Sequence, residues 1–338
     1  MQKTDRVHFL TTNGTLRRKD NNLLFVKTDE EGREGESRYL PIEMIDELYI
    51  LAKTQLDSET LAFLGDNNIL VHIFTHYGAF RGNFYPSTPN SVNKSGFVLL
   101  SQLRAFDDPK HRLYIAKAIT KAHLQNALGN LKRYEADDGL AIDEIIDSIE
   151  RQESIEALMG AEGSFKKRYY EAWNRIIKNQ RSFKFVERSK RPPRDKINLL
   201  ISYFNTRIYN ICLSEIYKTE LDPRIGYLHE PNFRSLSLHL DLAEIFKPLI
   251  ADGLIFTMLN KEELKASDFE SDSGRLRIHK EAIKRIELRF IERLTSTIEI
   301  NIGGSKQSLT WRQVIRREAN RLKKCICEFS EYEGFVRA

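Results

Sequence analysis

The stretch YPSTPNSVNKSG, residues 85–96, divides the chain into two parts whose hydrophobic residues follow different periods. It contains two prolines and several Ser and Asn residues, without the regular apolar spacing of a helix or a strand. Such composition is typical of exposed connections between domains. We therefore predict an N-terminal domain over residues 1–84, a linker over 85–96 and a C-terminal domain over 97–338.

The residues before this linker have the pattern of a β domain. Short runs rich in β-branched and aromatic residues are separated by turn sequences such as Asn13-Gly14. Runs bounded by turns in this way predict β-strands. The runs are VHFLTT (7–12), LLFVKT (23–28), RYLPI (38–42), ELYIL (47–51) and ILVHIFT (69–75). The segment LDSETLAFLG, residues 56–65, predicts a short helix before the last of these strands.

After the linker, apolar residues recur every three or four positions, which is the period of an amphipathic α-helix. The predicted helical segments are 111–134, 139–160, 194–217, 226–252, 277–296 and 311–329. The chain is therefore expected to be an α+β protein, in which a small N-terminal β-strand domain is followed by a larger all-α-helical domain.

The composition is that of a soluble protein of 338 residues, with 41% hydrophobic and 30% charged residues. No apolar stretch approaches eighteen residues, and the polar N-terminus lacks the apolar core of a signal peptide. Three cysteines, Cys212, Cys325 and Cys327, form no regular framework for disulfides or zinc. We therefore expect a cytoplasmic protein that makes no contact with a membrane.

Positive charge is concentrated between residues 166 and 196, the segment that we call the basic window. It holds twelve Lys or Arg residues against three Asp or Glu, although the net charge of the whole chain is only +5. Five aromatic residues are interleaved with these charges: Tyr169, Tyr170, Trp173, Phe183 and Phe185. A solvated helix face would explain part of this pattern, but the concentration favours contact with a nucleic-acid backbone and its bases. The predicted DNA-binding residues are Lys166, Lys167, Arg168, Arg175, Lys184, Arg188 and Arg191.

Two carboxylates stand beside the apolar face of the predicted helix in GYLHEPNFRSLSLHLDLAEIFKPLIAD, residues 226–252. Asp241 and Glu244 are neighbours at positions i and i+3, so their charges repel unless they share a cation, which could be Lys, Arg or a metal. His229 precedes the helix and can fold back over its first turns. Imidazole and carboxylates without a thiolate suit Mg²⁺ or Mn²⁺ better than zinc.

A third carboxylate, Glu162, lies between small residues in GAEG, residues 160–163, four residues before the basic window. Small neighbours permit the close approach of another helix or of DNA. A carboxylate beside a phosphate-binding surface suits metal-dependent phosphodiester chemistry. The alternative is a glutamate near a helix N-terminus, where the helix dipole favours negative charge.

Three segments occur in the order GAEG (160–163), RSKRPPRDKINLLISY (188–203) and GYLHE…SLSLHLDLAEIFKPLIAD (226–252). In this combination the chain resembles the CRISPR-associated adaptation integrase family, the first of the CRISPR-associated proteins. The resemblance extends over the whole chain, because the family also has a small N-terminal β domain followed by a larger helical one.

The resemblance implies a metal site formed by Glu162, His229 and Glu244. It also implies that Asp241 supports this site and that Lys247 lies near the active centre, so these five residues are the expected catalytic set.

The resemblance also concerns two positions outside the expected catalytic set. Asn198 matches a recurrent structural asparagine. The family often has Lys and Asn three residues apart in its first long helix, where this chain has His123 and Asn126; we do not expect this departure to affect the chemistry.

The activity implied by the resemblance is that of a metal-dependent DNA endonuclease and integrase using Mg²⁺ or Mn²⁺. Such a protein inserts spacer DNA into a CRISPR array, in antiviral defence, by attack of a 3′-hydroxyl on a phosphodiester. The implied partners are spacer and repeat DNA, a second copy bound through the β domain, and a small second CRISPR-associated protein that bridges two dimers. The alternatives are a non-catalytic nucleic-acid-binding module whose carboxylates pair with Lys or Arg, and a divalent-metal nuclease or phosphodiesterase of unrelated biology.

Overall fold

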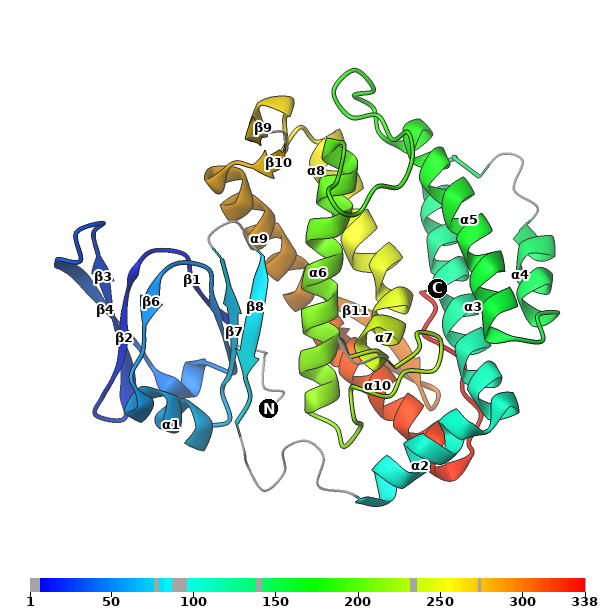
Figure 1. The fold of residues 1–338 in the computed structure, drawn as a ribbon, viewed down its shortest axis with the longest axis horizontal. Coiled ribbons are helices and arrows are strands. Elements are labelled where there is room, and N and C mark those ends of the chain that lie inside the picture. The colour runs from blue at the N-terminus through cyan, green and yellow to red at the C-terminus, as the bar shows by residue number, and fades with distance from the viewer. Residues whose placement is uncertain are drawn as a thin grey trace. The chain divides into compact units, whose positions relative to one another are not determined.

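The computed structural model describes residues 7–75, 79–86, 96–137, 142–231, 236–272 and 275–337, and it divides into two compact units (Figure 1). The first unit comprises Met1–Ser91 and Ile278–Thr295, and the second comprises Val92–Arg277 and Ser296–Ala338. Residues 87–95, most of the predicted linker, lie outside the described residues.

The first unit contains two four-stranded sheets, with strand orders β1-β5-β7-β8 and β4-β3-β2-β6. In the first sheet β1, β5 and β7 are parallel and β8 is antiparallel; in the second, β2, β3 and β4 are antiparallel and β6 runs parallel to β2. The strands are β1 (Val7–Leu10), β2 (Gly14–Lys19), β3 (Asn22–Thr28), β4 (Glu34–Leu40), β5 (Glu47–Ile50), β6 (Thr54–Gln55), β7 (Leu70–Phe74) and β8 (Phe80–Phe84). The 3-10 turn η1 (Ile42–Met44) and the helices α1 (Ser58–Asp66) and α9 (Lys280–Thr295) complete this unit.

The core of the first unit is an apolar cluster to which both sheets and α1 contribute. Leu48 and Val71 come from one sheet, Leu16 and Phe25 from the other. The alternation of strand residues sends these side chains to the shared face. At Gly14 the strands β2 and β3 approach closely. A Cβ atom there would lie 2.4 Å from the Val26 carbonyl oxygen, so a larger residue would push the two strands apart.

The second unit is mostly helical. Its helices are α2 (Gly96–Asp107), α3 (Pro109–Arg133), α4 (Ile142–Glu150), α5 (Ile155–Ile176), α6 (Lys196–Tyr217), α7 (Leu238–Phe246), the π-helical segment η2 (Lys247–Asp252), α8 (Gly253–Asn260), the 3-10 turn η3 (Ala266–Asp268) and α10 (Trp311–Glu328). Two small sheets pair β9 (Phe269–Asp272) with β10 (Arg275–Ile278) and β11 (Thr297–Ile302) with β12 (Ser305–Thr310). Among the described helices, none has both the length and the apolar character needed to cross a bilayer.

The predicted fold class is confirmed: an N-terminal β-strand region precedes a mostly helical region. Several details differ from the expectation: β2, β6, β8 and α2 were not predicted, and the helix in 226–252 begins only at Leu238. The two small sheets were not predicted, and the segment 139–160 contains two helices because the Ser154 side chain caps α5 by accepting a hydrogen bond from Ala157 N at 3.2 Å. The helix predicted over 277–296 groups with the first unit, since periodicity identifies a helix but not the core on which it packs.

Helix packing in the second unit brings distant segments of the sequence together. Helix α3 contacts α5 and α7, and α7 also contacts α6 (Figure 1). The predicted site residues lie on α5, on α7 with η2, and on the loop before α7. The fold therefore places them around one region of the helical unit.

Candidate active site

Glu162 of α5 and Glu244 of α7 meet inside the helical unit, where they are 6% and 2% exposed. The ammonium group of Lys166 lies between them, 2.9 Å from Glu162 Oε1 and 3.1 Å from Glu244 Oε2. Lys166 follows Glu162 by one helical turn, so both residues face α7. The two carboxylates therefore share a cation position, which an ammonium group fills in this structure.

Lys247 binds the other oxygen of the same carboxylate. Its Nζ donates to Glu244 Oε1 at 2.6 Å and lies 4.6 Å from the centre of the Tyr209 ring. Burial disfavours the charged carboxylate, but Lys166 and Lys247 outweigh this effect and hold the pKa of Glu244 well below its usual range. Burial also disfavours the ammonium form of each lysine, yet Glu244 raises the pKa of both. The buried charges therefore stabilise one another.

His229 is oriented by Asp241, which is fully buried on α7. The Nδ1 atom of His229 donates to Asp241 Oδ1 at 2.8 Å, since a carboxylate can only accept. The same carboxylate accepts from the backbone N–H groups of Tyr227, Leu228 and His229 at 2.6, 3.1 and 2.9 Å. Burial lowers the pKa of His229, but the hydrogen bond and charge of Asp241 outweigh it and the net shift is upward. Asp241 thus fixes both the loop and the imidazole.

The loop that carries His229 needs the glycine at its start. A Cβ atom on Gly226 would lie 2.8 Å from the His229 carbonyl oxygen and 2.9 Å from the backbone of Ser237. The Gly226 N–H donates to Ser237 Oγ at 2.8 Å. This tight turn lets His229 fold back over the first turns of α7, as the sequence suggested.

The second ring nitrogen of His229 faces the carboxylates, with Nε2 3.9 Å from Glu244 Oε1. In the neutral imidazole the proton sits on Nδ1 and Nε2 presents a lone pair, which is the arrangement found in metal-binding histidines. We call the group Glu162, His229, Asp241, Glu244 and Lys247 the carboxylate centre. It brings together all five residues of the expected catalytic set.

A second imidazole, His123 of α3, lies beside the same carboxylate, and the sequence analysis assigned it no role. Its Nδ1 donates to the Glu244 carbonyl oxygen at 2.8 Å and lies 3.8 Å from Glu244 Oε2. His123, Glu162 and Glu244 offer three possible ligand atoms within 4.8 Å of one another. The two imidazoles differ in their hydrogen bonds: the His123 nitrogen nearest to Glu244 donates to a carbonyl, whereas His229 uses its other nitrogen, Nδ1, to donate to Asp241. Burial, and then the charge of Lys166, lower the pKa of His123, so this imidazole stays neutral.

A buried carboxyl group, Asp252, lies near the centre at the end of η2. Burial raises the pKa of Asp252 to about 7, although the hydrogen bond that Tyr169 Oη donates at 2.8 Å opposes the shift. No sequence pattern marked Asp252, because its hydrogen bond with Tyr169 joins η2 to α5, which are far apart in the sequence.

The basic window divides into buried and exposed parts. Lys166 belongs with the carboxylates, and the guanidinium of Arg188 donates to two side chains of α6, Asn198 Oδ1 at 2.7 Å and Ser202 Oγ at 3.2 Å. Asn198 is fully buried and also receives the backbone N–H of Ser189 at 3.0 Å. The other predicted DNA-binding residues are exposed: Lys167, Arg168, Arg175, Lys184 and Arg191.

Four of the five aromatic residues of the basic window are unavailable for the base contacts that the sequence suggested, and the fifth, Tyr170, is half-buried. Tyr169, Trp173, Phe183 and Phe185 are buried, each less than 5% exposed. Trp173 packs against Phe256 of α8 with ring centres 4.6 Å apart. The interpretation was wrong because alternation with charge also arises when one face of a segment packs into the core.

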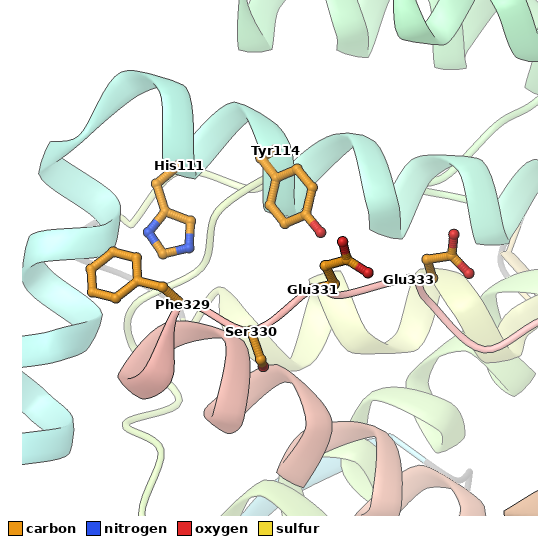
Figure 2. Close-up of a pocket in the computed structure, with 6 residues that line it drawn as sticks. All are labelled: His111, Tyr114, Phe329, Ser330, Glu331 and Glu333. Carbon is orange, nitrogen blue, oxygen red and sulfur yellow. The ribbon is translucent and has the colours of Figure 1, made fainter. Parts of the chain in front are cut away.

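A pocket of about 490 Å³ lies elsewhere on the helical unit (Figure 2). Figure 2 shows His111 and Tyr114 of α3 facing the segment after α10, which carries Phe329, Ser330, Glu331 and Glu333. No residue of the carboxylate centre lines this pocket.

Comparison with known proteins gives one family. The family described as "CRISPR associated protein Cas1" matches residues 8–292. The chain is 36% identical over 336 residues to the CRISPR-associated endonuclease Cas1 of Clostridium perfringens, with 97% of this chain and 98% of the relative covered.

Two solved structures have folds similar to that of this chain. A Cas1 protein of Thermotoga maritima is 30% identical and superposes with a TM-score of 0.83, covering 98% of this chain and 99% of the other. A casposase bound to integration product has a TM-score of 0.82 at 20% identity, covering 98% and 93% of the two chains, which is a likeness of fold.

Proposed function

The chain belongs to the CRISPR-associated Cas1 family, and from this premise we propose that it is a metal-dependent DNA endonuclease and integrase that inserts spacer DNA into a CRISPR array. The observation that carries the proposal is the carboxylate centre. Two buried glutamates from different helices meet beside a histidine whose tautomer is fixed by a buried aspartate. Such a costly arrangement of buried charge is typical of an active site.

The donor set fits a divalent cation. Lys166 Nζ lies within 3.1 Å of both glutamates, so the centre accepts positive charge between them. Glu162, Glu244 and His229 Nε2 would hold Mg²⁺ or Mn²⁺, and the absence of a thiolate among them disfavours zinc. When bound, the cation would stabilise the negative charge that develops on the phosphate oxygens during attack by a 3′-hydroxyl.

The protein's own residues orient and neutralise the reacting groups. Asp241 keeps the proton of His229 on Nδ1, so Nε2 stays available on the side of the carboxylates. Lys247 holds Glu244 in its ionised form and in one orientation. Lys166 is 25% exposed at its side chain, so its ammonium can reach a phosphate oxygen once another cation neutralises the glutamates.

We further propose that the DNA backbone lies along the exposed part of the basic window. Lys167 and Arg168 follow Glu162 on α5, and both are exposed. Contacts of this kind hold a phosphate backbone without reading its bases, which suits an enzyme that inserts fragments of varied sequence.

Two protein partners belong to the same proposal. The first is a second copy of the chain bound through the N-terminal β unit, and the second is a small second CRISPR-associated protein that bridges two such dimers. Membership of the family supports both. Sedimentation of the chain alone and with the small partner would measure the assembly.

A second candidate function rests on the lysines. Lys166 and Lys247 already pair with the glutamates, so the chain could instead be a non-catalytic DNA-binding module in which these ion pairs are structural.

The two candidates differ in a strand-transfer assay with labelled fragments and a repeat-containing plasmid. We expect transfer with Mg²⁺ or Mn²⁺ and its loss with a chelator, whereas DNA binding without any strand transfer or cleavage would support the module. A panel of DNA and RNA substrates separates the integrase from a nuclease of unrelated biology.

A further inference from the structure

Helix α3 presents three polar side chains to the main chain that carries Glu244. His123, Asn126 and Asn130 are spaced by three and four residues, so they share one face of α3. His123 Nδ1 donates to the Glu244 carbonyl at 2.8 Å, and Asn126 Nδ2 to the Ile245 carbonyl at 3.1 Å. Asn130 Nδ2 donates to the Pro248 carbonyl at 2.7 Å. One face of α3 thus bonds three carbonyl groups, those of Glu244, Ile245 and Pro248, at the junction of α7 and η2.

The sequence explains why the Glu244 carbonyl needs a donor from outside its helix. In an α-helix this carbonyl would accept from the N–H four residues later, but residue 248 is proline and has no N–H. The helix changes to the wider π form at Lys247. A buried carbonyl without a hydrogen-bond donor destabilises the fold, so a donor from a neighbouring helix is favourable at this point.

His123 supplies that donor through Nδ1. The imidazole is 3% exposed and edge-on to Phe165, with ring centres 6.4 Å apart. It therefore has little freedom to turn, and the hydrogen bond fixes the backbone at the residue whose side chain pairs with Lys166 and Lys247.

We infer that His123 is a positioning residue: by donating to the carbonyl that loses its α-helical donor at Pro248, it sets the direction of the Glu244 carboxylate. This inference rests on the proposed function for its catalytic consequence, but the hydrogen bond itself is independent of activity. It also gives the first long helix a role, since the His123 and Asn126 positions both bind the chain of α7.

A double-mutant cycle tests the inference. His123→Leu removes the donor, whereas Pro248→Ala restores an N–H that can reach the Glu244 carbonyl from within the helix. We expect His123→Leu to weaken Mn²⁺ binding, measured by electron paramagnetic resonance, and the rate of strand transfer by about 10–100-fold, as for other residues that orient a metal ligand. In the Pro248→Ala background the same change should cost less than about 3-fold, because the carbonyl no longer depends on α3.

Two variants separate positioning from packing and from direct ligation. His123→Gln keeps a donor of similar reach and should recover most of the loss in Mn²⁺ binding. Thr120→Val is the matched control, since Thr120 is fully buried on the same helix and its hydroxyl bonds to no residue of the described chain. It should leave Mn²⁺ binding unchanged.

A metal-free arm keeps this inference apart from the proposed function. In urea, His123→Leu should raise the unfolding equilibrium constant by roughly 10-fold or more in the parent chain and much less in the Pro248→Ala background. Equal losses in both backgrounds would overturn the inference, whatever the activity. If the two substitutions are coupled in urea unfolding but the protein has no metal-dependent activity, the proposed function is refuted and the positioning of Glu244 by His123 stands.

Discussion

The carboxylate centre and the basic window show opposite relations between sequence and structure. The centre is inconspicuous in the sequence, since its members lie on α5, the loop before α7, α7 and η2, yet all five come together and are mostly buried. The basic window is the most conspicuous charge pattern in the chain, yet its side chains are divided among the centre, a segment anchored by Asn198 and open surface. Density of charge along a sequence therefore says less about a site than the convergence of a few residues.

The difference follows from solvation. A charge in the carboxylate centre is surrounded by protein and depends on its partners, so removing one partner has a large effect. A charge on the exposed part of the window is solvated and screened, so each one contributes little by itself. Five predictions, in order of decreasing effect, test this contrast.

The largest effect is expected from Glu162→Gln, which keeps the size of the side chain but removes its charge. Strand transfer should fall to background, because loss of a residue that merely orients a ligand already costs 10–100-fold. Glu171→Gln on the exposed face of α5 is the matched control and should retain activity. Transfer by Glu162→Gln at the parental rate would remove this residue from the centre.

The second prediction concerns the thermal stability of the metal-free protein when the Glu244 carboxylate is removed. From sequence alone, losing a buried carboxylate should relieve repulsion and stabilise the metal-free protein. The structure pairs Glu244 with Lys166 and Lys247, so Glu244→Ala should instead lower the melting temperature.

The third prediction concerns the pH dependence of the free energy of unfolding, which the buried Asp252 carboxyl group should change. Its pKa rises from 3.8 to about 7 on folding, so the folded protein holds a proton that the unfolded chain releases between these values. The contribution to stability is fully present below pH 3.8 and is lost as the pH rises through 7. Relative to Asp252→Asn, the free energy of unfolding should fall by up to about 4 kcal/mol over this range, at about 1.4 kcal/mol per pKa unit.

The measurement is urea unfolding of parent and variant from pH 4 to 8. Asp147→Asn, at an exposed position of α4, provides the control and should show no such trend. A pH-independent difference between the parent and Asp252→Asn would show that this carboxyl group titrates normally.

A smaller effect is expected from Asp241→Asn, which leaves one acceptor oxygen for the four donors that the carboxylate now serves. His229 loses its fixed tautomer, so strand transfer should fall by about 10–100-fold. The metal concentration for half-maximal rate should rise as well. Unchanged metal dependence would mean that His229 acts without touching the metal.

The smallest effect belongs to the exposed part of the window. Lys167→Glu with Arg168→Glu should weaken DNA binding by a similar factor for all sequences and reduce the slope of log affinity against log salt by about 2. Lys132→Glu with Arg133→Glu makes the same charge change at exposed positions of α3 and should leave the slope unchanged. Equal slopes for both double variants would place the DNA elsewhere.

Much of the fold and part of the site follow from the sequence. Periods of two and of three to four residues identify the β region and the helices, because each reflects one exposed and one buried face. The neighbouring positions of Asp241 and Glu244, and of Glu162 and Lys166, follow from helix geometry. Gly226 and Pro248 also carry local information, since one permits a tight turn and the other removes an N–H group.

Tertiary structure alone decided which partners these residues meet. The pairing of Glu162 with Glu244 through Lys166, the donation from His123 to the Glu244 carbonyl, and the burial of Asp252 all depend on how α3, α5 and α7 pack. Local sequence specifies which face of a helix is apolar, but many packings satisfy that pattern. The choice among them is made by contacts between residues far apart in the chain, and these contacts determine where buried charges find their partners.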